Sequence, residues 1–146
     1  MTDLTLREIT RDTFRDIVKL EVGPDQQQFV ASNAVSIAEA SFYPQAWFRA
    51  IYADEQPVGF VMLYEDPEKG EYYLWRFMIA AGQQGKGYGR RALELVVEHV
   101  RDRPNARELR ASYVPGDGCP APFYAKYGWV ETGEVEDGEN VIRYAL

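Results

Sequence analysis

The chain has very little cysteine and histidine. Cys119 is its single cysteine and His99 its single histidine. One cysteine cannot form a disulfide within the chain, and this pair leaves no Cys/His set for a structural zinc ion. We therefore expect no disulfide framework and no metal site.

Long apolar runs and an excess of positive charge are absent too. No run of about eighteen apolar residues occurs, and the opening MTDLTLREITRD lacks the basic-then-apolar order of a secretory signal. These absences predict a cytoplasmic protein without a membrane partner. The formal net charge of -7 argues against a nucleic-acid partner, because phosphate backbones are bound mostly by lysine and arginine. It suits a cationic substrate, although ordinary solubility explains it equally well.

What the chain does contain is a regular succession of strand and helix patterns. Its 146 residues, 46% hydrophobic and 27% charged, fit a single domain over 1–146. Apolar periodicity and the turn residues between the patterns predict the order β-α-α-β-β-β-α-β-α-β-β. The expected strands cover 5–9, 48–52, 58–64, 72–79, 109–114, 130–135 and 141–145, and three of the expected helices cover 32–40, 90–103 and 121–127. The first expected helix is capped by Thr10 or Thr13, has Phe14, Ile17 and Val18 on one face, and ends before Gly23-Pro24.

The stretch QQGKGYG, residues 83–89, stands where the fourth expected strand meets the third expected helix. The first turn of a helix presents N–H groups without partners and a partial positive charge, so it binds anions. Gly85, Gly87 and Gly89 remove side chains that would hold a phosphate away. Full positive charges are added by Lys86, Arg90 and Arg91. The pattern predicts a ligand with a di- or triphosphate; a tight turn with solvated charges is the alternative.

Two familiar phosphate motifs do not fit this stretch. A Walker P-loop needs four residues between its first glycine and Gly-Lys, whereas Gly82 and Gly85 are separated by two. A dinucleotide fingerprint needs its third glycine one residue later than Gly89 and follows an opening strand. Both readings are therefore disfavoured.

Gln84-x-x-Gly87-x-Gly89 resembles the Gln/Arg-x-x-Gly-x-Gly/Ala signature of the GNAT superfamily of N-acetyltransferases. The segment Phe123-Tyr124-Ala125-Lys126-Tyr127-Gly128-Trp129 is similar to a second segment of that family. Residues 26–40 are similar to a bacterial branch that includes diamine (spermine/spermidine) acetyltransferases.

This resemblance implies both a fold and a reaction. The fold is α/β (α+β): a mixed, mostly antiparallel sheet of six to seven strands, splayed between strands 4 and 5 and flanked by about four helices. Acetyl-CoA would lie in the splay, and a small-molecule amine, expected to be a polyamine or diamine, would attack its thioester directly. Another amine (an aminoglycoside, an amino acid or a protein N-terminus) and a non-catalytic acetyl-CoA sensor are the alternatives. Members of the family often dimerise, so a homodimer is an expected assembly.

The resemblance also implies roles for residues on the cofactor side. A backbone N–H near Met78 or Ile79 is expected to stabilise the thioester oxygen. Tyr124 would donate a proton to the leaving sulfur, the alternative being a half-buried packing role. The residues expected to bind acetyl-CoA are Phe77, Met78, Ile79, Gln84, Gly85, Lys86, Gly87, Tyr88, Gly89, Arg90, Asp117 and Tyr124.

The acceptor side is less defined by the sequence. Glu39 is the candidate general base, and Glu21, Glu39 and Trp75 are candidate contacts to a cationic amine. Solvated helix-end carboxylates and core packing are the alternatives. Strand alternation places Tyr73 and Trp75 on one face and Leu74 and Arg76 on the other. His99 is assigned a structural role.

Two features depart from the family pattern. Asp117 stands where the family has asparagine, and an ionised carboxylate cannot donate the amide's hydrogen bond to the cofactor. Pro120 and Pro122 flank the start of the last expected helix, which predicts that this helix begins near Pro122. Cys119 is expected to be a small apolar filler.

Overall fold

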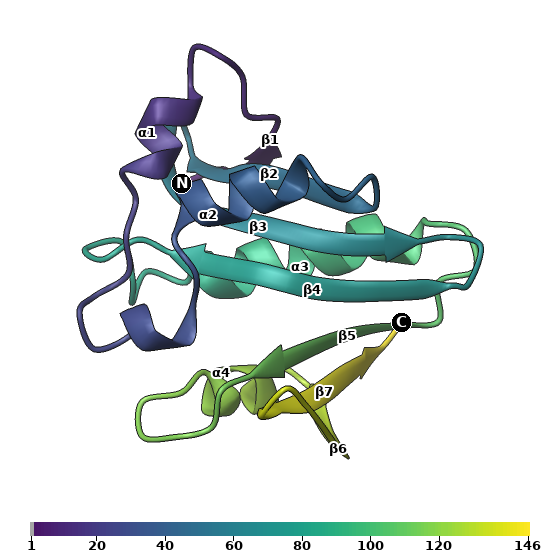
Figure 1. The fold of residues 1–146 in the computed structure, drawn as a ribbon. Helices are drawn as coiled ribbons and strands as arrows, with labels where there is room; N and C mark the ends of the chain where they lie inside the picture. Colours follow the sequence, from purple (N-terminus) through teal and green to yellow (C-terminus); the bar gives the residue numbers. More distant parts are fainter. Residues whose placement is uncertain (1) are drawn as a thin grey trace.

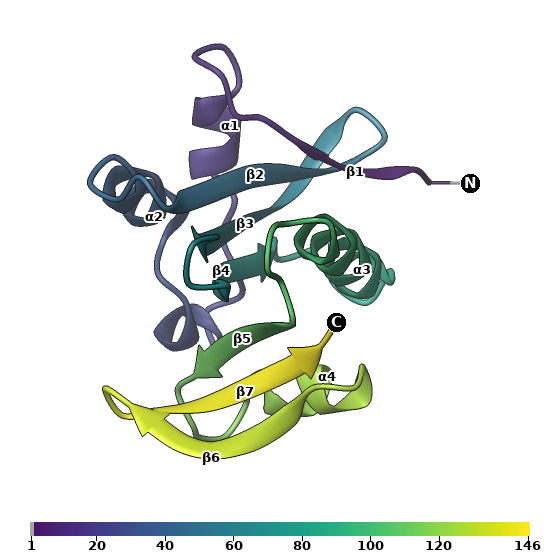
Figure 2. The same ribbon diagram turned by 90° about the vertical axis from the view of Figure 1, so that its right-hand side faces the viewer.

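The computed structural model describes residues 2–146, which form one seven-stranded sheet with helices on both faces (Figures 1 and 2). The strands are β1 (Leu4–Arg7), β2 (Ala46–Ala53), β3 (Gln56–Asp66), β4 (Glu71–Ile79), β5 (Glu108–Tyr113), β6 (Val130–Glu136) and β7 (Glu139–Ala145). The helices are α1 (Phe14–Val18), the 3-10 helix η1 (Gln27–Phe29), α2 (Asn33–Ala40), α3 (Tyr88–Arg101) and α4 (Ala121–Lys126). The predicted fold class is confirmed, and η1 is the one described helix that the periodicity did not indicate.

The order of strands in the sheet is β1-β2-β3-β4-β5-β7-β6. Every neighbouring pair is antiparallel except β4 and β5, which run parallel. The parallel pairing joins only Tyr73 to Arg110 and Leu74 to Ala111. Beyond Leu74 the two strands diverge toward their carboxyl ends, as Figure 1 shows. The expected splay between the fourth and fifth strands is therefore present.

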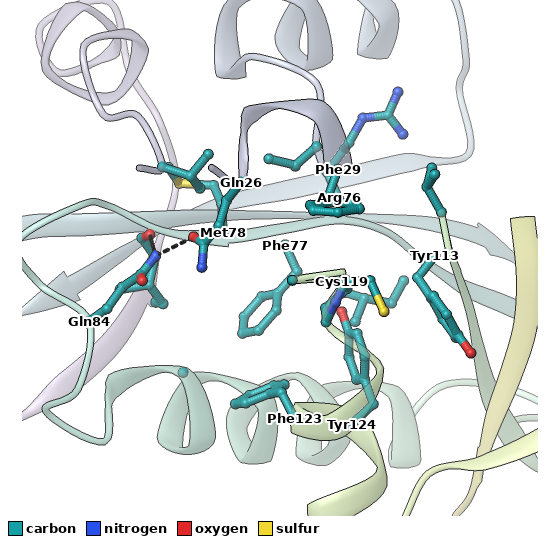
Figure 3. A pocket seen from close by; sticks show the side chains of 18 of the residues that line it. Gln26, Phe29, Arg76, Phe77, Met78, Gln84, Tyr113, Cys119, Phe123 and Tyr124 are labelled. Carbon is teal, nitrogen blue, oxygen red and sulfur yellow. Dashed lines mark hydrogen bonds between the residues drawn. The ribbon is translucent and has the colours of Figure 1, made fainter. Parts of the chain in front are cut away.

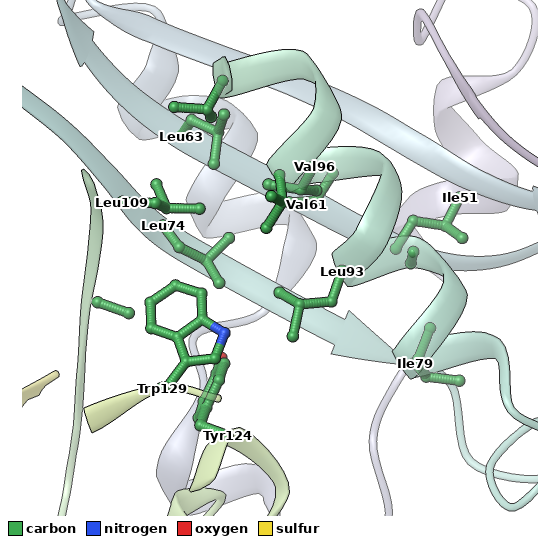
Figure 4. Packing of buried hydrophobic residues seen from close by; sticks show 14 of the residues in the cluster. Ile51, Val61, Leu63, Leu74, Ile79, Leu93, Val96, Leu109, Tyr124 and Trp129 are labelled. Atoms are coloured by element: carbon green, nitrogen blue, oxygen red, sulfur yellow. The ribbon is translucent and has the colours of Figure 1, made fainter. Parts of the chain in front are cut away.

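The two faces of the sheet bury separate apolar clusters. On one face α3 packs through the five positions that its periodicity predicted, all of them buried: Ala92, Leu93, Val96, Val97 and Val100. These side chains meet residues of β3 and β4 such as Val61, Leu63 and Leu74 (Figure 4). On the other face α1 and α2 cover a cluster that contains Phe60 and Met78.

Strand β4 contains a bulge at Trp75. In its pairing with β3, Leu74 is opposite Leu63 and Arg76 is opposite Met62, so Trp75 is the extra residue. One extra residue shifts the alternation of faces by one position. Trp75 packs on the α1/α2 face and Arg76 reaches Glu39 of α2, whereas Leu74 faces α3. The prediction that Leu74 and Arg76 share a face was wrong for this reason.

Two local predictions at the C-terminal end can be compared with the structure. Asp137 and Gly138 have φ values of 51° and 79° and connect β6 to β7, the geometry of a two-residue hairpin turn. Helix α4 begins at Ala121 with Pro120 as its N-cap, one residue before the expected start. Proline is accommodated in this first turn because the missing N–H has no helical partner there.

No helix formed by residues 2–146 has the length and apolar character needed to cross a membrane.

Truncating a side chain between α3 and the sheet should destabilise the whole domain. Leu93 is 3% exposed, and Leu93→Ala should lower the free energy of unfolding by about 2–5 kcal/mol, because the lost contacts leave a cavity. Urea unfolding measures this loss. Glu98→Ala on the exposed side of the same helix is the control and should stay within about 0.5 kcal/mol. A loss below about 1 kcal/mol for Leu93→Ala would contradict this account of the core.

Candidate functional site

A cavity of about 790 Å³ occupies the splay between β4 and β5. Residues 74–79 of β4 and residues 112–114 at the end of β5 form its walls. The loop before α3, helix α4 and the η1 segment (residues 22–31) complete the lining. Its volume is in the range of small-molecule and cofactor sites. The sequence thus folds so that the glycine loop and the C-terminal helix meet around one space.

The glycine loop opens onto this cavity. Gly85 and Gly87 have φ values of 79° and 81°, and a Cβ added to either would meet nothing within 4 Å. Gly87 is the N-cap of α3 without a side-chain capping bond, and no acidic residue stands in the first turn. The first-turn N–H groups of α3 are therefore available to a ligand. This is the geometry in which a helix N-terminus holds a pyrophosphate.

Glycine is required at position 89 for a different physical reason than at positions 85 and 87. A Cβ at this position would lie 3.3 Å from the Phe123 ring, so the missing side chain lets α4 approach α3. Phe123 in turn contacts Tyr124 at a ring-centroid distance of 5.5 Å. Gly89 therefore helps to position Tyr124 as well as the loop.

Gln84 fixes the loop in place. Its Nε2 donates to the carbonyl oxygen of Ile79 at 2.9 Å. It also donates to Oε1 of Gln26 at 2.9 Å (Figure 3). The first bond ties the loop to the end of β4, and the second ties it to the η1 segment. Arg90 lines the cavity and pairs with Glu94 at 3.0 Å. Lys86 bonds to Gln83 at 3.1 Å and is not among the lining residues.

Tyr124 lies on the same side of the cavity as Phe77 and Phe123, with its hydroxyl pointing into the space between the strands (Figure 3). The residue is 8% exposed, and burial raises the pKa of its phenol. A raised pKa keeps the phenol protonated at neutral pH, so it can serve as a proton donor. Cys119 also lines the cavity.

The acceptor-side candidates divide into two groups. Trp75 lines the cavity and packs edge-on against Tyr43, with ring centroids 5.2 Å apart. Glu39 is outside the lining and pairs with Arg76 at 2.8 Å. Glu21 is exposed, and its backbone carbonyl oxygen accepts a hydrogen bond from the N–H of Ala81 at 2.7 Å.

The structure brings most of the predicted cofactor residues to one cavity. The lining contains Phe77, Met78, Ile79, Gln84, Gly85, Gly87, Tyr88, Gly89, Arg90 and Tyr124, together with the acceptor candidate Trp75. Lys86, Asp117, Glu21 and Glu39 lie outside it.

Among the lining residues that sequence reasoning missed are Ser112, Tyr113 and Glu139 around β5 and Phe29 in the η1 segment. The Tyr113 hydroxyl donates to the carboxylate of Glu131, which raises the pKa of Tyr113. Ser112 and Glu139 line the cavity, and Phe29 of η1 closes it from the opposite face. The acidic run from Glu131 to Glu139 was the sequence signal for the two carboxylates that Ser112 and Tyr113 contact. The η1 segment carries no comparable pattern.

His99 lies outside the cavity, as its assigned structural role requires. Its Nε2 is 2.7 Å from Oε2 of the buried Glu65, and its ring stacks on Trp47 at 4.0 Å. Across residues 2–146 no group of three or more histidine, cysteine, aspartate or glutamate side chains is placed to hold a metal ion.

Comparisons with known proteins agree with this geometry. The sequence profile of the acetyltransferase (GNAT) family matches residues 5–129. Two Bacillus subtilis proteins are 26% identical over 149 residues, covering 95% of this chain and 96% of each relative. They are named "Probable spermine N(1)-acetyltransferase" (subsp. natto) and "Spermine/spermidine N(1)-acetyltransferase" (strain 168).

Solved structures share the fold at low identity. The GNAT domain of S. lividans PAT has a TM-score of 0.77 at 16% identity, covering 99% of this chain and 90% of that one. The PaiA N-acetyltransferase of Thermoplasma acidophilum, solved in complex with coenzyme A, has a TM-score of 0.72 at 13% identity, covering 99% of each chain. The family match extends over the strands, the glycine loop and the tyrosine-bearing helix that surround the cavity. This chain therefore belongs to the acetyltransferase (GNAT) family and is an acetyl-CoA-dependent N-acetyltransferase.

Proposed function

We propose that this single-domain enzyme transfers the acetyl group of acetyl-CoA to a primary amine of a polyamine or diamine. The observation that carries the proposal is the similarity to the two Bacillus subtilis relatives over 95% of the chain, at 26% identity. The net charge of -7 is in keeping with a cationic acceptor.

On the cofactor side, the proposal assigns binding and orientation to the backbone. Acetyl-CoA, when bound, supplies an acetyl group activated as a thioester. The N–H groups that follow Gly87 would hold its pyrophosphate, and the edge of β4 from Phe77 to Ile79 would align its pantetheine arm. A backbone N–H at Met78 or Ile79 would stabilise the negative charge that develops on the carbonyl oxygen.

The reaction also requires two proton movements. A primary alkylamine has a pKa near 10.4, so about one molecule in a thousand is unprotonated near neutral pH and the amine must lose a proton before it attacks. As the amine nitrogen bonds to the acetyl carbon, the carbon–sulfur bond breaks and the sulfur takes up a proton. Tyr124 is the proposed donor because its phenol is protonated and faces the cavity.

The role of Glu39 as the general base stays a prediction. One of its oxygens is occupied by Arg76 at 2.8 Å, and its side chain is outside the cavity lining. In this conformation Glu39 neutralises Arg76, which keeps a positive charge from opposing a cationic acceptor. Trp75 is the proposed aromatic contact to the amine, because it lines the cavity and a ring face attracts ammonium groups. The roles of Glu21 and Asp117 stay predictions, since both lie outside the cavity.

Assembly and location also stay predictions. A cytoplasmic location is expected from the sequence patterns described above. A homodimer is expected because members of the family often dimerise.

Release of free coenzyme A, followed with a thiol reagent, tests the function. The purified protein is assayed with acetyl-CoA and a panel of spermidine, spermine, aminoglycosides, amino acids and short peptides. We expect saturable release of coenzyme A with the polyamines. Mass spectrometry should then detect a polyamine product that carries one acetyl group. Release confined to another class of amine would overturn the substrate, and acetyl-CoA binding without release from any amine would favour a sensor.

Blocking the open side of the glycine loop should abolish cofactor binding. Gly87→Leu places a side chain in the space beside the first turn of α3 and should weaken acetyl-CoA binding by at least about 100-fold, as judged by calorimetry. Gly133→Leu is the matched control, because Gly133 has a φ of 85° with nothing within 4 Å of its Cβ, and it lies outside the cavity. Both variants carry the cost of a left-handed φ. Equal affinities in the two variants would contradict the assignment of the loop.

Removing the Tyr124 hydroxyl should slow turnover without weakening binding. Tyr124→Phe keeps the ring packing but removes the proton donor, so kcat should fall by about 100-fold while the acetyl-CoA Kd stays within about twofold. Tyr127→Phe, at the C-cap of the same helix and also lining the cavity, is the control and should retain its kcat. An unchanged kcat in Tyr124→Phe would remove this tyrosine from the mechanism.

A further inference from the structure

We propose that Glu139 binds an ammonium group of the acceptor and so selects polyamines over monoamines. This inference rests on the proposed function and names the residue that would carry its specificity. Glu139 is the first residue of β7, and its side chain lines the cavity.

The position of Glu139 places it on the acceptor face of the sheet. Along β5 the residues Leu109, Ala111 and Tyr113 are buried in the cluster under α3, so Ser112 faces the other way. The Ser112 hydroxyl donates to Oε1 of Glu139 at 3.1 Å. Glu139 is therefore on the face opposite α3 and α4.

Figure 2 shows this arrangement at the level of the elements: η1 and the turn between β6 and β7 lie on one side of the sheet, and α3 and α4 lie on the other. The acceptor candidate Trp75 and its neighbour Arg76 share the face of Glu139, because the β4 bulge turns both toward α2. Tyr124 and the glycine loop belong to the α3 side. An amine that approaches from the η1 side thus meets Glu139 on its way to the thioester.

Glu139 also differs in charge from every other lining residue that the structure describes. It is the only carboxylate among them. Each of the two cationic side chains of the lining pairs with a carboxylate outside it, Arg76 with Glu39 at 2.8 Å and Arg90 with Glu94 at 3.0 Å. Within residues 2–146, no lysine, arginine or histidine nitrogen lies within 4.0 Å of the Glu139 carboxylate. A partly buried carboxylate without a cation attracts one.

The surrounding hairpin strengthens this attraction. Residues 130–140 contain five acidic residues and no basic one: Glu131, Glu134, Glu136, Asp137 and Glu139. Arg110 pairs with Glu134 at 3.0 Å, and Tyr113 and Tyr73 donate to Glu131 and Glu136. The hairpin therefore adds negative charge to the segment around Glu139, which favours a substrate with several ammonium groups.

Steady-state kinetics of Glu139→Gln test the inference. The amide keeps an oxygen that can accept from Ser112 but removes the charge, so the variant isolates the electrostatic contact. With spermidine, KM should rise by about tenfold or more while kcat changes less than about threefold, because one charge-assisted hydrogen bond is lost. With hexylamine, which has no second ammonium group, kcat/KM should stay close to that of the wild type. Glu139→Asp should recover part of the spermidine affinity.

The control variant separates a direct contact from the general field of the hairpin. Asp137→Asn removes one charge from the same hairpin at a residue outside the cavity lining, and it should leave the KM for spermidine nearly unchanged. An equal rise in KM in both variants would overturn a direct contact. A fall in kcat with both amines in Glu139→Gln would instead identify a general base and overturn the binding role.

The same assays distinguish this inference from the proposed function. If the wild type acetylates no polyamine, the proposed function and this inference both fail. If it acetylates spermidine and Glu139→Gln does so with the wild-type KM, only the role of Glu139 fails. Thermal melting of each variant confirms that the compared proteins are folded.

Discussion

The short parallel pairing between β4 and β5 is the constraint on which the rest of the structure depends. Only Tyr73 and Leu74 of β4 pair with β5, so the sheet opens for the remaining length of β4. In a continuous sheet the facing edges would bond to each other and leave no space between them. Here the opening produces a cavity of about 790 Å³, and it leaves the β5-facing edge of β4 available to an extended ligand.

Three features of the chain adapt this opening to acetyl transfer. The bulge at Trp75 turns Trp75 and Arg76 to the acceptor face and returns Phe77 to the cofactor face. The glycine loop presents the N-terminus of α3 at the end of β4, and α4 brings Tyr124 against the same space. In the proposed mechanism, the donor and the acceptor enter from opposite faces of one sheet and meet between its strands.

The sequence predicted those parts whose signals are local. The apolar periodicity of α3, the turn at Asp137-Gly138 and the glycine pattern of residues 83–89 each depend on neighbouring residues, and each was found where expected. The resemblance to the GNAT family added the splay, which no local pattern indicates because it depends on how two distant strands pair.

The parts that could not be predicted depend on tertiary contacts. A bulge at Trp75 has no mark in the sequence, and it reversed the expected orientation of Arg76. Glu39 had the right residue type for a base, but its ion pair with Arg76 joins residues 37 positions apart. Glu139 is one of several acids in its segment, and only the pairing of β5 with β7 places it beside Ser112 and the cavity.

Hydrogen–deuterium exchange with and without acetyl-CoA tests the central claim, that the open edge of β4 and the glycine loop hold the donor together. The account predicts slower exchange on binding at the splay-facing amides of residues 75–79 and in the first turn of α3, with no change in residues 50–53 of β2, which pair with both β1 and β3. Protection of the α3 turn without any change in residues 75–79 would contradict it, because the donor would then be held at its phosphates and lie outside the splay.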